Sequence, residues 1–379
     1  MAHHYYIGLI SGTSVDGVDA VVVSIDCNNA ADRKFELLAS HIEPFPATVS
    51  DRIRSIMNPG RDGLDEVGAL DMEVAVVFAM AAQNALAKTA LVPRQILAIG
   101  SHGQTVRHRP GGSHPFSLQI GNPSSIAERT GITTVADFRA RDITAGGQGA
   151  PLVPAFHHWL FHSTMHDRIV VNIGGIANIT YIPSQGSVLG FDTGPGNALL
   201  DQWIRRHKNQ TYDRDGHWAA SGTMSDALLQ RLLTDPYFAK SPPKSTGREH
   251  FNLAWLDTVL ASISAPIPTQ DVQATLVEFT ARTIMQDIKR VGKTDEIFVC
   301  GGGGKNTVLM RALEHHAAGV PVKTTESLGL HPDWVEACAF AWLAYRRLNN
   351  LPGNLPSVTG AEHPCVLGGV YFGTNEHEG

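Results

Sequence analysis

The stretch from Tyr6 to Asp26 reads YIGLISGTSVDGVDAVVVSID and contains two apolar runs around a polar loop. The runs are short, rich in β-branched residues and bounded by glycine, which predicts two paired strands. A hairpin turn needs only about two to five residues, and Asp-Gly is one of the preferred pairs. This loop contains Asp16-Gly17 and, in addition, hydroxyls, a glycine and a second carboxylate that a turn does not require. The stretch therefore predicts a strand–loop–strand unit whose loop binds a ligand.

The same pattern returns near residue 170. DRIVVNIGGIANITYIP is again an apolar run, a Gly-Gly turn and an apolar run, and VLGFDTGPGNALLDQW then reads as a strand, a Gly-rich turn and a helix. The two patterns lie about 165 residues apart, which is too long for a solenoid repeat and suits two similar domains. Alternatively, such runs occur twice by chance, as they can in any α/β protein. We expect a divergent duplication.

The remaining segments fit an α/β chain. FELLASHIEPF could be a third strand of the first sheet, and ILAIGSHGQT reads as a buried strand that ends in a polar loop. Helical periodicity extends from Leu64 to Leu91, with Pro93 as the stop signal. ATLVEFTARTIMQDIKR and HPDWVEACAFAWLAYRRL predict two further helices, and EIFVC a strand. The segment from Thr211 to Ile267 is rich in Ser, Pro and charge, which predicts an insertion of helices and loops.

Composition narrows the class of protein. The chain has 379 residues, 43% of them hydrophobic, and a net charge of −6 without any Lys/Arg block, which argues against nucleic acid or an anionic membrane as the main partner. No apolar run reaches the 18 or so residues that span a bilayer. The four cysteines are far apart and form no CxxC pair; they are Cys27, Cys300, Cys338 and Cys365. With no signal peptide visible, we expect reduced thiols and a cytoplasmic protein.

Three Gly-rich loops are candidates for binding. In the first, N–H groups and hydroxyls of Ser11 to Ser14 could cradle phosphate oxygens. Asp16 and Asp19 would repel phosphate unless Mg²⁺ lies between them or one of them binds another group. The alternative is a polar hairpin with an Asx-type turn. The loop CGGGGKN, from Cys300 to Asn306, lacks Walker A spacing and is either a nucleotide site or a flexible turn.

The third loop, FDTGPGN, places Asp192 at the end of an apolar strand, before two glycines and a helix start. Asp192 could be a general base, a metal ligand or a helix cap.

Arg139 and Arg141 precede another Gly-rich turn and could bind carboxylate or phosphate, or form surface ion pairs. Gln104 either binds a ligand or satisfies buried backbone groups. No HExxH, GxSxG or Rossmann motif is present, which disfavours a zinc protease, a serine hydrolase and an NAD enzyme.

Together these segments resemble the anhydro-N-acetylmuramic acid kinases of bacterial cell-wall recycling. The resemblance covers nearly the whole chain and rests on GLISGTSVDGVD, SHGQTVRH, DFRARDITAGGQGAPLVPAFH, NIGGIANIT, FDTGPGNALLD, GGGGKN and HPDWVEACAFAWLA, in this order. That family belongs to the actin–hexokinase–Hsp70 superfamily. The resemblance therefore implies an α/β fold of two ribonuclease-H-like domains with an ATP and sugar cleft between them. The implied domains are 1–135 with about 350–379, and 136–349 with a helical insertion at about 211–267.

The resemblance also implies site residues, with Asp192 as the catalytic base. The implied ATP-phosphate residues are Ser11, Gly12, Thr13, Ser14, Val15, Asp16, Gly17, Val18, Asp19, Gly174, Gly175, Gly194, Gly196 and Asn197. The implied adenosine residues are Gly301, Gly302, Gly303 and Asn306, and the implied sugar residues are Asp19, Gln104, Arg139 and Glu336. Many superfamily members carry an Asp just before the first loop glycine, where this chain has Leu9, Ile10 and Ser11. No direct Mg²⁺ ligand is therefore implied, and ATP and water would hold the metal.

The reaction implied by the resemblance consumes ATP with Mg²⁺ and 1,6-anhydro-N-acetylmuramic acid, and the family implies a homodimer. Because an anhydro sugar has no free 6-hydroxyl, water would attack the anomeric carbon while O6 leaves to the γ-phosphate. One alternative is another small-molecule kinase of this fold that phosphorylates a free hydroxyl. A second alternative is a nucleotide-dependent clamp or regulator without a sugar pocket.

Overall fold

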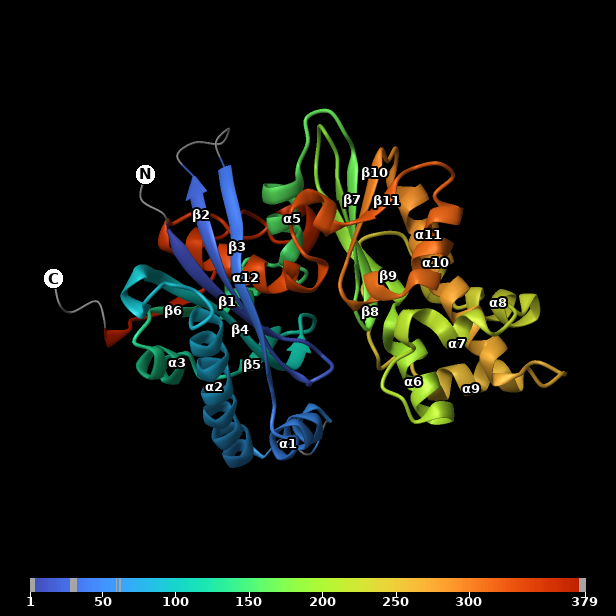
Figure 1. The fold of residues 1–379 in the computed structure, drawn as a ribbon, viewed down its shortest axis with the longest axis horizontal. Helices are drawn as coiled ribbons and strands as arrows, with labels where there is room; N and C mark the ends of the chain where they lie inside the picture. The colour runs from blue at the N-terminus through green and yellow to red at the C-terminus, as the bar shows by residue number, and fades with distance from the viewer. Residues whose placement is uncertain (1–3, 28–32, 59, 61–62, 375–379) are drawn as a thin grey trace. The chain divides into compact units, whose positions relative to one another are not determined.

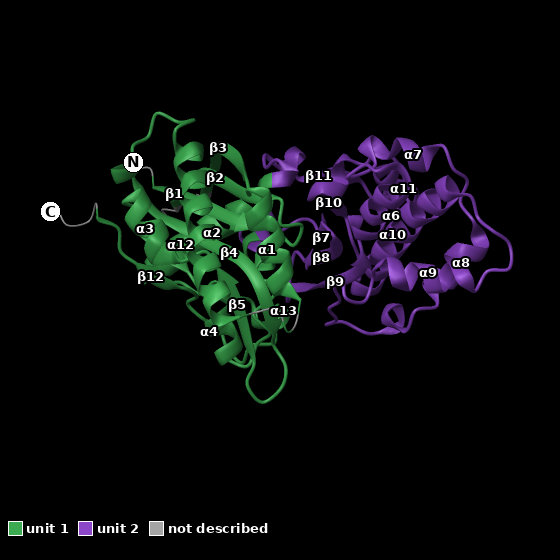
Figure 2. Ribbon diagram, turned by 90° about the horizontal axis from the view of Figure 1, so that it is seen from below, with its two compact units in different colours: residues 1–156, 334–379 green, residues 157–333 purple. Residues whose placement is uncertain are grey.

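The computed structural model describes residues 4–27, 33–58, 60 and 63–374. It divides into two compact units, residues 1–156 with 334–379 and residues 157–333 (Figure 2). The domain limits expected from the sequence, near residues 135 and 350, remain a prediction. None of the helices in the described part of the chain is long and apolar enough to cross a membrane.

Unit 1 is built on one mixed sheet (Figure 1). Over the described residues its strand order is β12-β6-β4-β1-β2-β3, with β5 paired to β4. Strands β1, β2 and β3 are antiparallel neighbours, whereas β4 runs parallel to β1 and to β6. The strands are β1 (Tyr5–Ser11), β2 (Gly17–Cys27), β3 (Arg33–Pro44), β4 (Ile96–Arg109), β5 (Phe116–Ile120), β6 (Thr134–Ala136) and β12 (Gly369–Tyr371).

The helices of unit 1 cover both faces of this sheet. Alternate residues of β1 point to opposite faces, and Ile7 and Leu9 enter a core cluster with residues of the first two helices. On the other face a Cβ at Gly8 or Gly100 would meet the backbone of the long C-terminal helix, so glycine is needed for this close packing. The helices are α1 (Ala47–Met57), α2 (Leu64–Leu86), α3 (Pro123–Thr130), α4 (Phe138–Thr144), α12 (Val335–Leu348) and α13 (Pro356–Thr359). Helix α5 (Val153–Phe161) includes residue 156, the last residue of this part of unit 1, and continues into unit 2.

Unit 2 repeats the strand order of the central part of unit 1. Its sheet reads β11-β10-β7-β8-β9, with antiparallel pairs β7/β8 and β8/β9 and parallel pairs β7/β10 and β10/β11. The strands are β7 (Arg168–Ile173), β8 (Ile176–Ile182), β9 (Leu189–Pro195), β10 (Glu296–Cys300) and β11 (Val322–Thr324). In unit 1 the corresponding order is β6-β4-β1-β2-β3 with the same strand directions. The predicted α/β class with two ribonuclease-H-like domains is confirmed.

The helices of unit 2 pack on its sheet through one core cluster, in which Ile169, Val171 and Ile173 of β7 join side chains of six helices. The helices are α6 (Asn197–Lys208), α7 (His217–Ala220), α8 (Asp226–Leu233), α9 (Leu253–Ala261), α10 (Thr269–Val291) and α11 (Thr307–His316). Helices α7, α8 and α9 lie within the segment from Thr211 to Ile267, which the sequence predicts to be an insertion of helices and loops.

One element differs from the sequence prediction. The helix expected to run from Leu64 to Leu91 is α2, and it ends at Leu86 rather than just before Pro93. Its last residues pack into the core, whereas Lys88, Thr89 and Leu91 make turn and loop hydrogen bonds instead. Pro93 begins a short 3-10 helix, Pro93–Gln95. A proline disfavours helix in the residue before it, so it does not fix where a helix ends further upstream.

Candidate functional site

The loop between β1 and β2 is exposed and anchored from one side. Gly12, Thr13 and Ser14 are exposed, and the Val15 N–H donates to the Gly12 carbonyl over 3.2 Å to close a tight turn. Val15 has φ 57°, a left-handed conformation that is unusual for a β-branched residue. Such strained positions concentrate at binding loops.

Helix α1 holds this loop through its carbonyl oxygens. The Arg54 guanidinium donates to the carbonyls of Ser14 and Val15 over 3.2 and 3.3 Å, and the Ser50 hydroxyl donates to the Val15 carbonyl over 3.0 Å. Arg54 also lies 3.8 Å from the exposed Asp16 carboxylate. The carbonyls of the loop are therefore turned toward the protein, and its two exposed hydroxyl side chains remain available to a ligand.

Gln104 lies beside Ser11 because β4 and β1 are parallel neighbours in register. The Ser11 hydroxyl donates to Gln104 Oε1 over 2.7 Å, and Gln104 Nε2 donates to the Thr105 carbonyl over 3.1 Å. Both side chains are buried. One of the two amide protons of Gln104 is thus used inside unit 1, which leaves one proton for a ligand.

Arg139 is held on α4 by two partners. Its Nη1 donates to the Gly149 carbonyl over 2.7 Å, and its Nη2 lies 2.8 Å from His102 Nε2. Burial, assisted by the Arg139 charge, lowers the pKa of His102 well below its usual value. The imidazole is therefore neutral and accepts from the guanidinium. Burial lowers the pKa of Arg139 itself to about 10, against the opposing effects of Glu336 and Asp142.

Glu336 and Asp19 complete the residues of unit 1 that the sequence implies for the sugar. Glu336 lies in the first turn of α12, where burial raises its pKa and the Arg139 charge acts in the opposite direction. Asp19 is half-buried in β2, opposite Ile10 of β1. Unit 1 therefore brings an arginine and a carboxyl into electrostatic contact, and it joins Ser11 to Gln104. His102 is a residue that the sequence reasoning missed, although it stands two positions before Gln104.

In unit 2, Asp192 lies in β9 and its carboxylate is largely buried. Burial raises its pKa to about 6, with a further increase from Glu249 and opposing effects from the Thr246 N–H and Lys244. A carboxylate with this pKa is ionised at neutral pH and is a stronger proton acceptor than an ordinary aspartate. This arrangement suits a general base. The Asp192 side chain does not cap α6, whose N-cap residue is Gly196.

The segment inserted after α6 fixes Asp192, a role that the sequence did not reveal. The Thr246 N–H donates to Asp192 Oδ2 over 3.1 Å, the Asp192 N–H donates to the Lys244 carbonyl over 3.1 Å, and the Tyr237 hydroxyl donates to the Asp192 carbonyl over 2.6 Å. Lys244 is anchored in turn by a buried ion pair with Asp287 at 2.7 Å. A Ser/Pro-rich insertion gives no sequence signal for such contacts.

The Gly-rich loops of unit 2 meet one another. The N–H groups of Gly196 and Ala198 donate to the Gly175 carbonyl, and the Asn197 N–H donates to the Gly174 carbonyl, all over 2.8 to 3.0 Å. A Cβ at Gly196 would collide with the Gly174 carbonyl oxygen, so this contact requires glycine. Gly194, with φ 144°, lies in the same turn.

The loop after β10 approaches β7 in the same way. Gly301 has φ 78°, and a Cβ there would collide with the Asn172 side chain; a Cβ at Gly303 would meet Ile173. The side chain of Asn306 accepts from the N–H groups of Val308 and Leu309 over 3.1 Å and thereby caps α11.

A pocket of about 510 Å³ in unit 2 lies beside these loops. Its lining includes Asn197, Gly302 and Asn306, three of the residues that the sequence implies for ATP. It also includes Tyr212 and Arg214 from the inserted segment, which sequence reasoning missed. Its volume is in the range of small-ligand sites.

The described residues hold no group of three or more His, Cys, Asp or Glu side chains that could bind a metal ion. Cys300, Cys338 and Cys365 are buried and form no disulfide with one another. Burial raises the pKa of Cys338, as expected for an inert thiol.

Comparison with known proteins places the chain in a family. A model of the family "Anhydro-N-acetylmuramic acid kinase" matches residues 4–373. The chain belongs to the anhydro-N-acetylmuramic acid kinase family. The family resemblance and the carbohydrate-kinase class predicted from the sequence are confirmed.

Relatives of the same name cover almost the whole chain. The anhydro-N-acetylmuramic acid kinase of Saccharophagus degradans is 48% identical over 97% of this chain and 98% of its own. The Shewanella loihica enzyme is 49% identical over 98% of this chain and 100% of its own. The Shewanella oneidensis enzyme is 50% identical over 97% of this chain and 98% of its own. This family member is therefore an ATP-dependent kinase rather than a nucleotide-dependent clamp.

Proposed function

We propose that this kinase converts 1,6-anhydro-N-acetylmuramic acid to N-acetylmuramic acid 6-phosphate in murein recycling. The observation that carries the mechanism is Asp192, whose buried carboxylate has a pKa of about 6. One hydrogen bond holds this carboxylate, and two more hold the backbone of the same residue. It accepts a proton from water while the water oxygen bonds to the anomeric carbon. The bond from that carbon to O6 breaks, O6 bonds to the γ-phosphorus, and ADP leaves.

The loops supply the phosphate contacts in this proposal. In unit 1 the exposed Gly12, Thr13 and Ser14 offer N–H groups and hydroxyls. In unit 2 the linked turns at Gly174–Gly175 and Gly194–Asn197 offer a rigid backbone surface. Mg²⁺, held by ATP and water, would neutralise charge on the transferred phosphoryl group. Rigid donors stabilise the transition state because they require little reorganisation.

The adenosine is assigned to the 510 Å³ pocket of unit 2. Gly302 and its neighbours Gly301 and Gly303 leave room for a flat ring because they carry no side chain. Asn306 keeps its amide nitrogen available, since its oxygen caps α11. Tyr212 is 53% exposed and lines the same pocket, so it can stack on the base.

The sugar is assigned to Asp19, Gln104, Arg139 and Glu336 of unit 1. Arg139 is the only one of the four that carries a positive charge, and it would bind the lactyl carboxylate or a sugar oxygen. Burial raises the pKa of Glu336, and its carboxyl group would accept hydrogen bonds from ring hydroxyls. A homodimer in the cytoplasm, as the family implies, completes the proposal.

The test is phosphoryl transfer from [γ-³²P]ATP to 1,6-anhydro-N-acetylmuramic acid, with N-acetylmuramic acid and N-acetylglucosamine as comparison sugars. Labelled 6-phosphate from the anhydro sugar alone is the expected result. Label on a free sugar only would instead make the protein a kinase of a free hydroxyl, with Asp192 removing the proton of that hydroxyl.

A further inference from the structure

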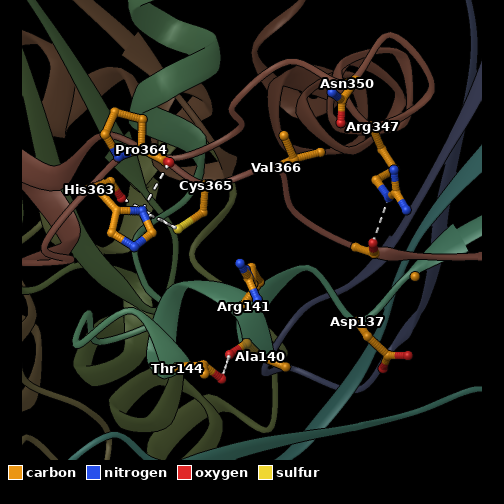
Figure 3. Close-up of a pocket in the computed structure, with 12 residues that line it drawn as sticks. Asp137, Ala140, Arg141, Thr144, Arg347, Asn350, His363, Pro364, Cys365 and Val366 are labelled. Carbon is orange, nitrogen blue, oxygen red and sulfur yellow. Dashed lines mark hydrogen bonds between the residues drawn. The ribbon is translucent and has the colours of Figure 1, made fainter.

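Unit 1 contains a pocket to which the proposed reaction assigns no ligand. It has a volume of about 730 Å³ and lies between α4, the C-terminal end of α12 and the segment before β12 (Figure 3). Arg141, Arg347 and His363 line it, together with one carboxylate, Asp137. None of these four residues belongs to the sites assigned above.

Helix α4 separates this pocket from the sugar residues. Arg139 and Arg141 are two positions apart, and successive helical residues turn by about 100°, so these side chains leave the helix on nearly opposite sides. Arg139 donates to Gly149 and His102, whereas Arg141 is exposed and points toward Cys365 and Val366 (Figure 3).

The two guanidinium groups carry positive charge that no described carboxylate balances by a direct ion pair. Arg347 donates from Nε to the Gly368 carbonyl over 2.8 Å, and both of its terminal NH₂ groups remain. Arg141 lines the pocket, and its interaction with the Cys365 thiol opposes the rise that burial causes in the pKa of that thiol. Because arginine binds phosphate oxygens in a fork geometry, this pair suits an oxyanion.

The carboxylate of Asp137 is held in the pocket by an unusual backbone. Asp137 has φ 59° at the start of α4, and its side chain does not cap that helix. The carboxylate instead accepts from the Tyr371 hydroxyl over 2.8 Å. Left-handed aspartate is tolerated but uncommon, and such strained residues concentrate at binding sites.

The wall that carries Cys365 is firmly attached to α4. The buried Asp142 carboxylate accepts from Asn354 Nδ2 over 2.6 Å and from the Thr359 hydroxyl over 2.7 Å. The Asn354 oxygen accepts in turn from the Cys365 N–H over 2.6 Å. The pocket is therefore preformed, which lowers the ordering cost of binding.

We propose that this pocket binds a small phosphorylated sugar, with its phosphate at Arg141 and Arg347 and a hydroxyl at Asp137. The balance of charges selects this class. Two arginines attract an oxyanion, and one fixed carboxylate accepts from hydroxyls while it repels a second anionic group. A bare inorganic anion would leave Asp137 without a hydrogen-bond donor from the ligand.

The test is calorimetric titration of the full-length protein with N-acetylglucosamine 6-phosphate, in the presence of saturating Mg²⁺ and a non-hydrolysable ATP analogue. We expect saturable binding that Arg141→Gln weakens about tenfold or more, because a charged hydrogen bond is lost. Arg129→Gln, a change at an exposed arginine on α3, is the matched control and should leave binding unchanged. Absence of binding, or equal binding by the two variants, would overturn the proposal.

Two further variants locate the ligand. Arg139→Gln should retain the binding; if it abolishes binding and Arg141→Gln does not, the ligand occupies the sugar site and the proposal is wrong. Asp137→Asn should weaken binding of the sugar phosphate without affecting inorganic phosphate. Equal affinity of the wild type for both probes would contradict the assignment of a hydroxyl to Asp137. Thermal unfolding of each variant verifies that it is folded.

Discussion

The hairpins at the centre of the two sheets differ although the sheets share one strand order. In unit 1 the β1–β2 connection is a polar loop whose carbonyls are held by α1, with Thr13 and Ser14 exposed. In unit 2 the β7–β8 connection is the bare pair Gly174–Gly175, whose carbonyls accept backbone hydrogen bonds from Gly196 to Ala198 at the start of α6. One hairpin offers side chains, and the other offers a surface without them.

This difference determines which elements of each unit carry the candidate functional groups. The Gly174–Gly175 turn has no functional side chain, so the proposed base of unit 2 comes from another strand, as Asp192 of β9. In unit 1 the polar groups come from the hairpin itself and from β4, α4 and α12. A repeated sheet can therefore carry two different sets of polar groups because loops change more easily than the strand pairing that supports them.

The largest expected effect comes from the proposed base of unit 2. Asp192→Asn should lower kcat about 10²- to 10⁴-fold, because the amide cannot accept a proton from water, with little change in the KM for ATP. Steady-state kinetics measures this, with Asp226→Asn on the exposed start of α8 as control. Turnover near that of the wild type would remove Asp192 from the role of base.

The two hairpins should respond oppositely to an added methyl group. Gly196→Ala places a Cβ against the Gly174 carbonyl oxygen, so it should destabilise unit 2 by about 1–3 kcal/mol. At Gly12 the nearest atom is 4.0 Å away and φ is not left-handed, so Gly12→Ala should keep the stability. Its methyl group would nevertheless obstruct phosphate and raise the KM for ATP. Chemical denaturation and ATP titration separate the two effects; equal stability losses would refute the contrast.

The environment of Asp192 should be visible in the pH dependence. A base acts in its deprotonated form, and burial raises the pKa of Asp192 to about 6. As the pH falls below 6, kcat/KM should decrease about tenfold per pH unit, and it should be flat just above that limb. A limb near pH 4 would indicate a solvated carboxyl and contradict the burial argument.

The smallest expected effect concerns the adenosine pocket. Tyr212→Ala should raise the KM for ATP about 2- to 12-fold, since aromatic stacking contributes about 0.5–1.5 kcal/mol. Tyr212→Phe is the matched variant and should behave as the wild type, because stacking needs the ring and not the hydroxyl. An unchanged KM in the alanine variant would place the base elsewhere.

The strands around the opening loop and the second apolar pair near residue 170 were predictable because hydrophobic periodicity and glycine placement are local signals. The identity of Asp192 as a site candidate was likewise local, since it ends an apolar strand before two glycines. The residues that form hydrogen bonds with Asp192 were not predictable. Tyr237 and Thr246 reach Asp192 from 45 and 54 residues away, and no local pattern records such a contact.

The same limit applies to the arginines of α4. The sequence singled out Arg139 and Arg141 together, and either could have been a surface ion pair. Only the helical geometry shows that one side chain is buried against His102 while the other lines a separate pocket. Residues that neighbour one another in sequence can thus belong to two different sites.

The most direct test of the mechanism is to run the reaction in H₂¹⁸O and locate the label in the product by mass spectrometry. Water attack at the anomeric carbon predicts one ¹⁸O on C1 and none between C6 and phosphorus. Unlabelled product incubated in H₂¹⁸O for the same time corrects for exchange at C1. Product without ¹⁸O at C1 above that control would contradict the role of Asp192 as the base that activates water.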